Sequence, residues 1–176
     1  MPDYMIAYTG MYLASADIGD KTPTVKIARV VIELVEDDKK KGPDGKPLQK
    51  KKWIAFFERA EKGMVINRTN AELLVALVQH VTGMPRKQAG LTESWVGHAV
   101  TLQACDVKLG PDTVKGLRIV GSPELAQPLK VTIKLKKKAP KEHVLHPTGR
   151  GAAAPPPPAD EPPPPAEREA GEDDDQ

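Results

Sequence analysis

Cysteine is nearly absent from this chain of 176 residues, because Cys105 is its only one. An internal disulfide and a cysteine-rich zinc site are therefore excluded. Long uncharged runs are also missing: the two longest, residues 4–16 and 73–85, have 13 residues each. A membrane-spanning helix needs about 20 apolar residues, so neither run predicts one. The N-terminus has Asp3 and no basic region before an apolar stretch, and we expect a cytoplasmic protein without a signal peptide.

The sequence also lacks the residue patterns of common active sites. No Ser/His/Asp arrangement and no paired acids stand out, and residues 42–46 do not have the spacing of a phosphate-binding loop. His143 and His146 have a spacing compatible with a metal, but no cysteine or carboxylate cluster stands beside them. Cys105 alternates with polar neighbours, which favours a small packed side chain over a nucleophile. We therefore expect a protein that is not an enzyme and that uses no metal or cofactor.

Charge and proline divide the chain into two parts. Residues 151–176 hold eight acids and one base, whereas residues 1–150 hold 25 Lys plus Arg against 16 Asp plus Glu. The net charges are −7 and +9, and eight of the 18 prolines lie at 155–158 and 162–165. Such a tail has little to bury, so we predict a folded domain over residues 1–138 and a disordered, Pro-rich acidic tail over 139–176.

Alternating and β-branched residues predict a mainly β domain with one helix. A change of parity near Ala28–Arg29 predicts a bulge in the first long strand. The helix is expected to begin at a capping box of Thr69 and Glu72, to bury a stripe of leucines and valines that ends at Val81, and to stop at Gly83 and Pro85. The strands are predicted at 24–36, 53–58, 64–66, 98–108, 114–121 and 129–135.

This order, with a helix between the third and fourth strands, matches an OB-fold-like five-stranded barrel with an extra strand. OB-folds bind oligonucleotides on strands two and three and with the loops that join strands one–two and four–five. The first of these loops is predicted at 37–52 because it contains Gly42, Pro43, Gly45 and Pro47. The lysine-rich segment therefore falls at the loop that such a fold would use.

A nucleic-acid-binding surface is predicted from three sets of residues. Clustered lysines release counterions from a phosphate backbone, and aromatic faces stack on bases. In residues 53–58 we place Trp53 and Phe57 on the outward face, because Trp53 abuts the lysine run. A solubilising loop and ordinary core aromatics are the alternative interpretations. The predicted binding residues are Lys39, Lys40, Lys41, Lys46, Lys50, Lys51, Lys52, Trp53, Phe57 and, on the strand four–five hairpin, Lys108, Lys115 and Arg118.

Residues 62–74 (KGMVINRTNAELL) and 95–119 (WVGHAVTLQACDVKLGPDTVKGLRI) resemble small OB-like proteins encoded by phages and prophages. The resemblance covers roughly residues 11–121 and implies a replication or recombination module and an OB-like fold. The overall plan is also similar to that of single-stranded-DNA-binding proteins, which have a basic body, a flexible linker and an acidic tip. In the bacterial proteins of that kind the tip ends in a hydrophobic residue, whereas this chain ends in Gln176.

These observations predict a protein that binds single-stranded nucleic acid, DNA before RNA, with little sequence preference. In a phage setting it would act in the host cytoplasm, with replication or recombination proteins as partners of the acidic tail and no membrane as partner. Two alternatives stay open. One is a protein–protein adaptor that uses the polyproline segment 155–165, and the other is an accessory virion protein whose lysines only cover its surface.

Overall fold

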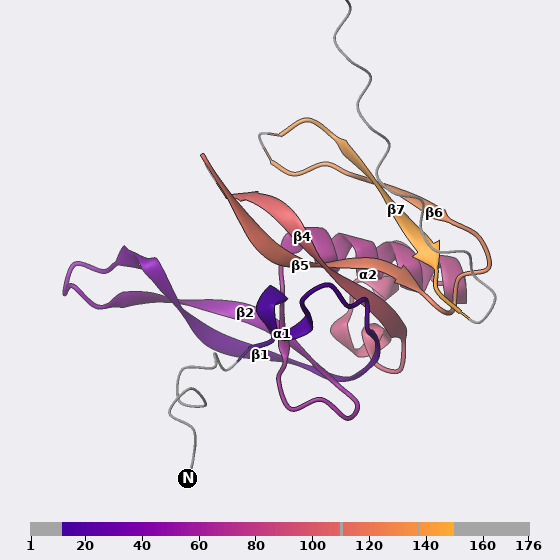
Figure 1. Ribbon diagram of the computed structural model, residues 1–176, viewed down its shortest axis with the longest axis horizontal. Coiled ribbons are helices and arrows are strands. Elements are labelled where there is room, and N and C mark those ends of the chain that lie inside the picture. Colours follow the sequence, from indigo (N-terminus) through magenta and orange to yellow (C-terminus); the bar gives the residue numbers. More distant parts are fainter. Residues whose placement is uncertain (1–11, 110, 137, 150–176) are drawn as a thin grey trace, which may run out of the picture.

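The computed structural model describes residues 12–109, 111–136 and 138–149, without the side chains of residues 37–40 and 109. A seven-stranded sheet and one long helix, α2 (Arg68–Thr82), dominate this part of the chain (Figure 1). The strands are β1 (Thr24–Lys41), β2 (Pro47–Phe57), β3 (Met64–Ile66), β4 (Ala99–Leu109), β5 (Asp112–Ser122), β6 (Leu129–Ile133) and β7 (Lys141–Pro147). The short helical elements are α1 (Ser15–Ile18), α3 (Arg86–Ala89) and a 3₁₀ turn, η2 (Thr92–Trp95).

The prediction of a mainly β fold is confirmed, and the strand order along the sheet is β3-β2-β1-β4-β5-β7-β6. The predicted bulge is also present, because the pairing of β1 with β2 shifts between Ile27 and Arg29. Before the bulge, Thr24–Lys26 pair with β4 instead. β1 therefore passes from one ladder to another, and the ribbon that it forms with β2 projects from the body (Figure 1).

The loop predicted over 37–52 is wrong in its extent. β1 continues to Lys41 and β2 begins at Pro47, so only residues 42–46 form the turn. Gly42 N donates to Lys46 O at 2.8 Å, and Gly45 has a left-handed φ of 76°. A tight turn brings the two lysine-rich segments opposite each other, and their backbones then pair whatever their side chains are.

Helix α2 begins earlier than the predicted capping box. Its N-cap is Asn67, whose Oδ1 accepts a hydrogen bond from Asn70 N at 2.9 Å. The predicted stop is confirmed, because Gly83 takes a left-handed φ of 72° after the last turn. The helix packs against β5 and β6 through its buried face, whereas Val81 is exposed. The buried apolar residues of α2 are Leu73, Leu74, Val75, Leu77 and Val78.

The prediction that the folded part ends near Lys138 is wrong. Residues 141–147 form β7, which pairs antiparallel with β6 from Lys141 to Leu145 and parallel with β5 at Gly121 and Ser122. A Cβ on Gly121 would lie 2.3 Å from His146 O, so the close approach of β7 requires glycine there. The acidic segment 151–176 lies outside the described residues.

Asn70 joins the start of α2 to the backbone of β5. Its side chain is fully buried; Nδ2 donates to Leu117 O at 3.0 Å, and Oδ1 accepts from Ile119 N at 3.2 Å. No strand of the described ladders supplies a hydrogen bond to these two backbone groups of β5, because β3 is an edge of the sheet and does not pair with β5. The residues just before α1 lie beside the β3 edge of the sheet: Leu13 N donates a hydrogen bond to the carbonyl oxygen of Gly63, the residue before β3, at 2.8 Å.

No helix within the described ranges is long and apolar enough to span a membrane.

Replacing Asn70 by leucine tests how much the fold depends on this contact. Asn70→Leu keeps an apolar side chain of similar size but leaves a backbone donor and a backbone acceptor of β5 unpaired. We expect the free energy of unfolding, measured by urea denaturation, to fall by about 3 kcal/mol. The control Asn67→Ala removes only a helix cap and should cost about 1 kcal/mol. A loss for Asn70→Leu no larger than that of the control would contradict the role of Asn70.

Candidate nucleic-acid interface

One face of the β1–β2 ribbon exposes apolar side chains beside a lysine. Trp53 pairs directly with Ile32, and Lys51 pairs with Leu34, so these four residues share a face of the ribbon. The exposed fractions are 40% for Trp53, 52% for Ile32 and 58% for Leu34. Exposed apolar groups of this size on neighbouring positions are characteristic of a binding surface. We call the face formed by Ile32, Leu34, Lys51 and Trp53 the ribbon face.

The ribbon face continues the core face of the sheet. Ala55, two residues after Trp53, is fully buried, and Ile66, which pairs with Trp53 from β3, is 6% exposed. Trp53 is exposed because the ribbon has left the body at this point. One face of β2 therefore contributes the buried Ala55 to the core and the exposed Trp53 to the ribbon face.

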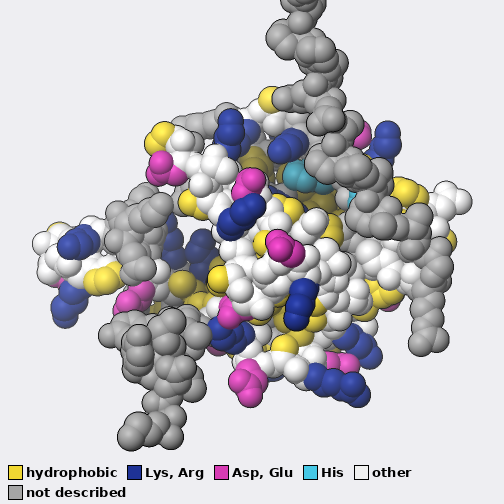
Figure 2. Space-filling model, in the orientation of Figure 1, with side chains coloured by type: hydrophobic (Ala, Val, Ile, Leu, Met, Phe, Trp, Pro, Cys, Tyr) yellow, Lys and Arg dark blue, Asp and Glu magenta, His cyan; other side chains and the backbone are white. Residues whose placement is uncertain are grey.

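The predicted lysines lie on both faces of the ribbon and at its turn: Lys51 shares the ribbon face, whereas the register places Lys50 and Lys52 on the opposite face. Lys41, Lys46, Lys50, Lys51 and Lys52 have exposed side chains on the ribbon or its turn, while the side chains of Lys39 and Lys40 lie outside the described residues. Figure 2 shows lysine and arginine side chains on the ribbon at the left of the view. A cationic ribbon with an apolar face has the two components that bind a flexible polyanion with flat, apolar bases.

The outward orientation predicted for Phe57 is wrong. Phe57 shares the face of Trp53 by alternation, but it lies inside the body, where its side chain is 4% exposed. On the opposite face of β2, Ile54 is also fully buried, and it contacts the segment at Gly63, where a Cβ would lie 2.6 Å from Ile54 Cγ2. Phe56 is half-buried beneath Arg29, whose guanidinium carbon lies 4.1 Å from the ring centroid.

No protein-family model, curated protein or solved structure matches this chain.

The three predicted residues of the β4–β5 hairpin do not join the ribbon face. Lys115 is exposed and pairs with Asp106 at 2.8 Å, and this partner raises the pKa of Lys115. Lys108 and Arg118 instead line a cavity of about 390 Å³ between the β4–β5 and β6–β7 hairpins. The structure thus separates the predicted site into the ribbon and this second region, which we call the hairpin pocket.

Burial affects the charged groups of the hairpin pocket. Arg118 is half-buried, and desolvation lowers the pKa of its guanidinium. His143 lines the same pocket; desolvation, followed by the charges of Arg118 and Lys141, lowers the pKa of its imidazole. Within the described residues, no group of three or more His, Cys, Asp or Glu side chains is placed to hold a metal ion.

Sequence reasoning missed Ile32 and Leu34 on the ribbon, and Lys138 and Lys141 in the hairpin pocket. Ile32 and Leu34 lie in a largely apolar run whose one charged residue between Val30 and Val35 is Glu33, a pattern that also fits a buried strand. Only their pairing with β2 in the folded chain shows that Ile32 and Leu34 lie on the part of the ribbon that projects from the body. Lys141 falls in the predicted tail, because the hydrophobic residues of β7 are few and interrupted by His143 and His146, and Lys138 falls at the predicted end of the folded domain.

The lowered pKa of His143 predicts a pH dependence of stability. Folded His143 binds its proton less tightly than the unfolded chain does, so its contribution is complete above the ordinary pKa of 6.5 and is lost as the pH falls through the lower folded pKa. We expect His143→Gln to flatten the decrease in unfolding free energy between about pH 7.5 and about pH 5, measured by urea denaturation. The control His80→Gln changes an exposed histidine of α2. Equal pH profiles of His143→Gln and the wild type would disprove this.

Proposed function

We propose that this protein binds single-stranded nucleic acid, DNA before RNA, through the β1–β2 ribbon and with little sequence preference. The exposed ribbon face, on a ribbon that also carries exposed lysines on its other face and at its turn, is the observation that supports this function. Trp53 would stack on a base, Ile32 and Leu34 would cover its apolar edge, and the lysines would contact phosphates. Such contacts discriminate little between bases, because every base has an aromatic face and every nucleotide a phosphate.

We further propose that β1–β5 form an OB-like barrel that is open at one seam. The support is the order β3-β2-β1-β4-β5 with α2 between β3 and β4. In a closed barrel of this order, β3 would pair with β5. Here Asn70 bonds to β5 near that seam, and Ser15 Oγ donates to Lys115 O at 3.4 Å. In such a fold the ribbon is the connection between strands one and two, one of the two loops that OB-folds use for oligonucleotides.

The proposed setting is phage-type replication or recombination, where single strands are exposed. A protein–protein adaptor acting through the proline-rich and acidic segment is the rival function. That segment lies outside the described residues. Because an adaptor needs no oligonucleotide contact at the ribbon face, binding of an oligonucleotide at that face distinguishes the two functions.

The first test is the salt dependence of binding to oligothymidine. Each phosphate neutralised on a single strand contributes about 0.7 to the slope of log affinity against log salt. Changing Lys46, Lys51 and Lys52 to alanine should therefore make the slope shallower by about 2, measured by fluorescence anisotropy of labelled oligothymidine. The matched control changes three exposed lysines away from the ribbon, Lys21, Lys87 and Lys134, and should change the slope much less. An unchanged slope in the ribbon variant would remove these lysines from the interface.

The second test uses the two tryptophans, whose environments differ. Trp95 is 3% exposed and donates its indole Nε1–H to Ala89 O at 2.8 Å, whereas Trp53 is 40% exposed. We expect oligothymidine to quench the fluorescence of Trp95→Phe, which retains Trp53, and not that of Trp53→Phe. Trp53→Ala should weaken binding by about tenfold, because one stacked base is worth about 1–3 kcal/mol. Quenching that persists in Trp53→Phe would show that the ribbon face does not stack on bases.

A further inference from the structure

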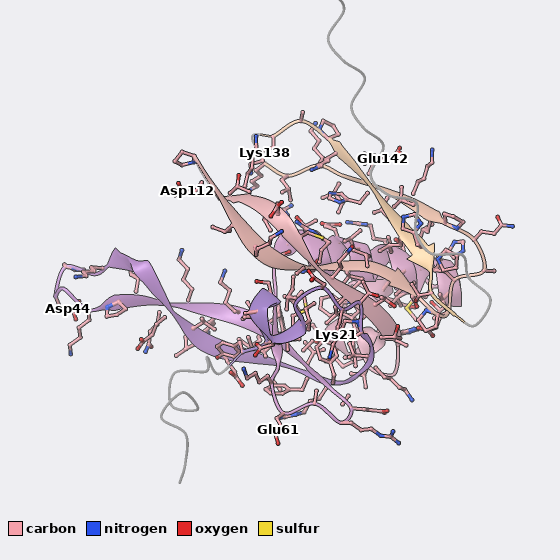
Figure 3. All side chains as sticks on the ribbon, viewed as in Figure 1. Lys21, Asp44, Glu61, Asp112, Lys138 and Glu142 are labelled. Atoms are coloured by element: carbon pink, nitrogen blue, oxygen red, sulfur yellow. The ribbon has the colours of Figure 1, made fainter. Side chains whose placement is uncertain are left out.

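The hairpin pocket concentrates positive charge that the ribbon does not use. Four cationic side chains line it against one carboxylate, and that carboxylate, Asp106, already pairs with Lys115. The cations come from both hairpins: Lys108 and Arg118 from β4–β5, and Lys138 and Lys141 from β6–β7. In Figure 3, Lys138 lies on the loop of the β6–β7 hairpin, on the side near the β4–β5 tip at Asp112.

Arg118, which lines this pocket, also has an unsatisfied donor. Its Nη1 is buried, and no hydrogen-bond acceptor within the described part of the chain reaches it. A buried guanidinium nitrogen without a hydrogen-bond partner lowers the free energy of unfolding, and folded proteins rarely contain one. The remaining lining groups include the hydroxyls of Thr69 and Thr113, and Thr69 lies in the first turn of α2, where the helix dipole is positive.

We propose that the hairpin pocket binds a phosphate group, with Arg118 as its buried anchor and Lys108, Lys138 and Lys141 around it. A phosphate monoester carries a charge of about −1.5 to −2 near neutral pH and three strong acceptor oxygens. These oxygens satisfy a guanidinium nitrogen and several ammonium groups at once, whereas a carboxylate supplies one charge and two acceptors. The apolar wall of Ile133 and Leu135 would contact whatever group carries the phosphate.

This site is separate from the ribbon face, and it does not depend on strand binding there. The bound phosphate is either a small anion, such as inorganic phosphate itself, or the terminal phosphate of a nucleic-acid strand. A strand whose terminal phosphate occupies the hairpin pocket would have a defined end on this protein, which the ribbon alone does not provide.

Full-length protein titrated with inorganic phosphate, at an ionic strength held constant with chloride, tests the proposal. The readout is the NMR shift of the His143 imidazole, which is assigned by its loss in His143→Gln. We expect a saturable shift in the wild type, and an affinity weakened by about tenfold or more in Arg118→Met and in Lys141→Met, since one charge-assisted hydrogen bond is worth that factor. Lys141 is exposed, so its variant keeps the test valid if Arg118→Met does not fold.

Lys134→Met is the matched control, because Lys134 is an exposed lysine just after β6 that does not line the pocket. It should retain the wild-type affinity for phosphate. Oligothymidine with a 5′-phosphate, compared with the same strand ending in a hydroxyl, distinguishes the sources. A stronger His143 shift with the phosphorylated strand assigns the pocket to strand ends, and equal shifts assign it to small phosphates.

Two results would overturn the proposal. One is a phosphate response that is absent, or equal in wild type, Arg118→Met and Lys141→Met. The other is tighter binding of an acidic peptide with the sequence of residues 172–176 than of phosphate, which would make the pocket a carboxylate site. Quenching of Trp53 by oligothymidine is measured on the same samples, so failure of the hairpin pocket and failure of the ribbon face are distinguishable.

Discussion

The transfer of β1 from one ladder to another is the constraint on which the rest of the structure depends. Thr24–Lys26 pair with β4, and from Ile27 onward the strand pairs with β2. The bulge between Ile27 and Arg29 bends the strand at this change, because an unpaired residue increases its local twist. The ribbon and the β4–β5 hairpin therefore leave the body as two separate projections (Figure 1). The ribbon face and the hairpin pocket each lie on one of these projections or beside it.

Stability and binding place opposite demands on these projections. The body buries its leucines, valines and isoleucines mainly in one hydrophobic core, and Asn70 satisfies the backbone of β5 where strand pairing does not. The ribbon, in contrast, exposes Ile32, Leu34 and Trp53, which burial would stabilise. Arg118 is a similar case, because the buried Nη1 of this half-buried side chain has no hydrogen-bond partner in the described part of the chain, and an unsatisfied buried donor lowers stability. Costs of this kind are typical of binding surfaces, where a ligand supplies the missing contacts.

Much of the fold was predictable from local pattern. Alternation located the strands of the body but not the lysine-rich halves of β1 and β2, which it left in a loop. The parity change at Ala28–Arg29 located the bulge, and Gly83 located the end of α2, since each of these features is set by backbone conformation within a few residues. β7 was not predictable in this way. It is held by two pairings, to β6 and to β5, and by the close approach at Gly121, all of which involve residues distant in sequence. Its polar composition alone favoured a tail.

The sequence by itself determined the charge of the body, the presence of a lysine-rich segment beside Trp53 and the absence of an internal disulfide, because these depend only on which residues are present and in what order. The tertiary structure decided which of them share a surface. Trp53 and Phe57 lie on one face of β2, yet only Trp53 is exposed, because the body ends between them. Arg118, Lys141 and His143 meet for the same kind of reason: exposure and proximity are properties of the packed chain.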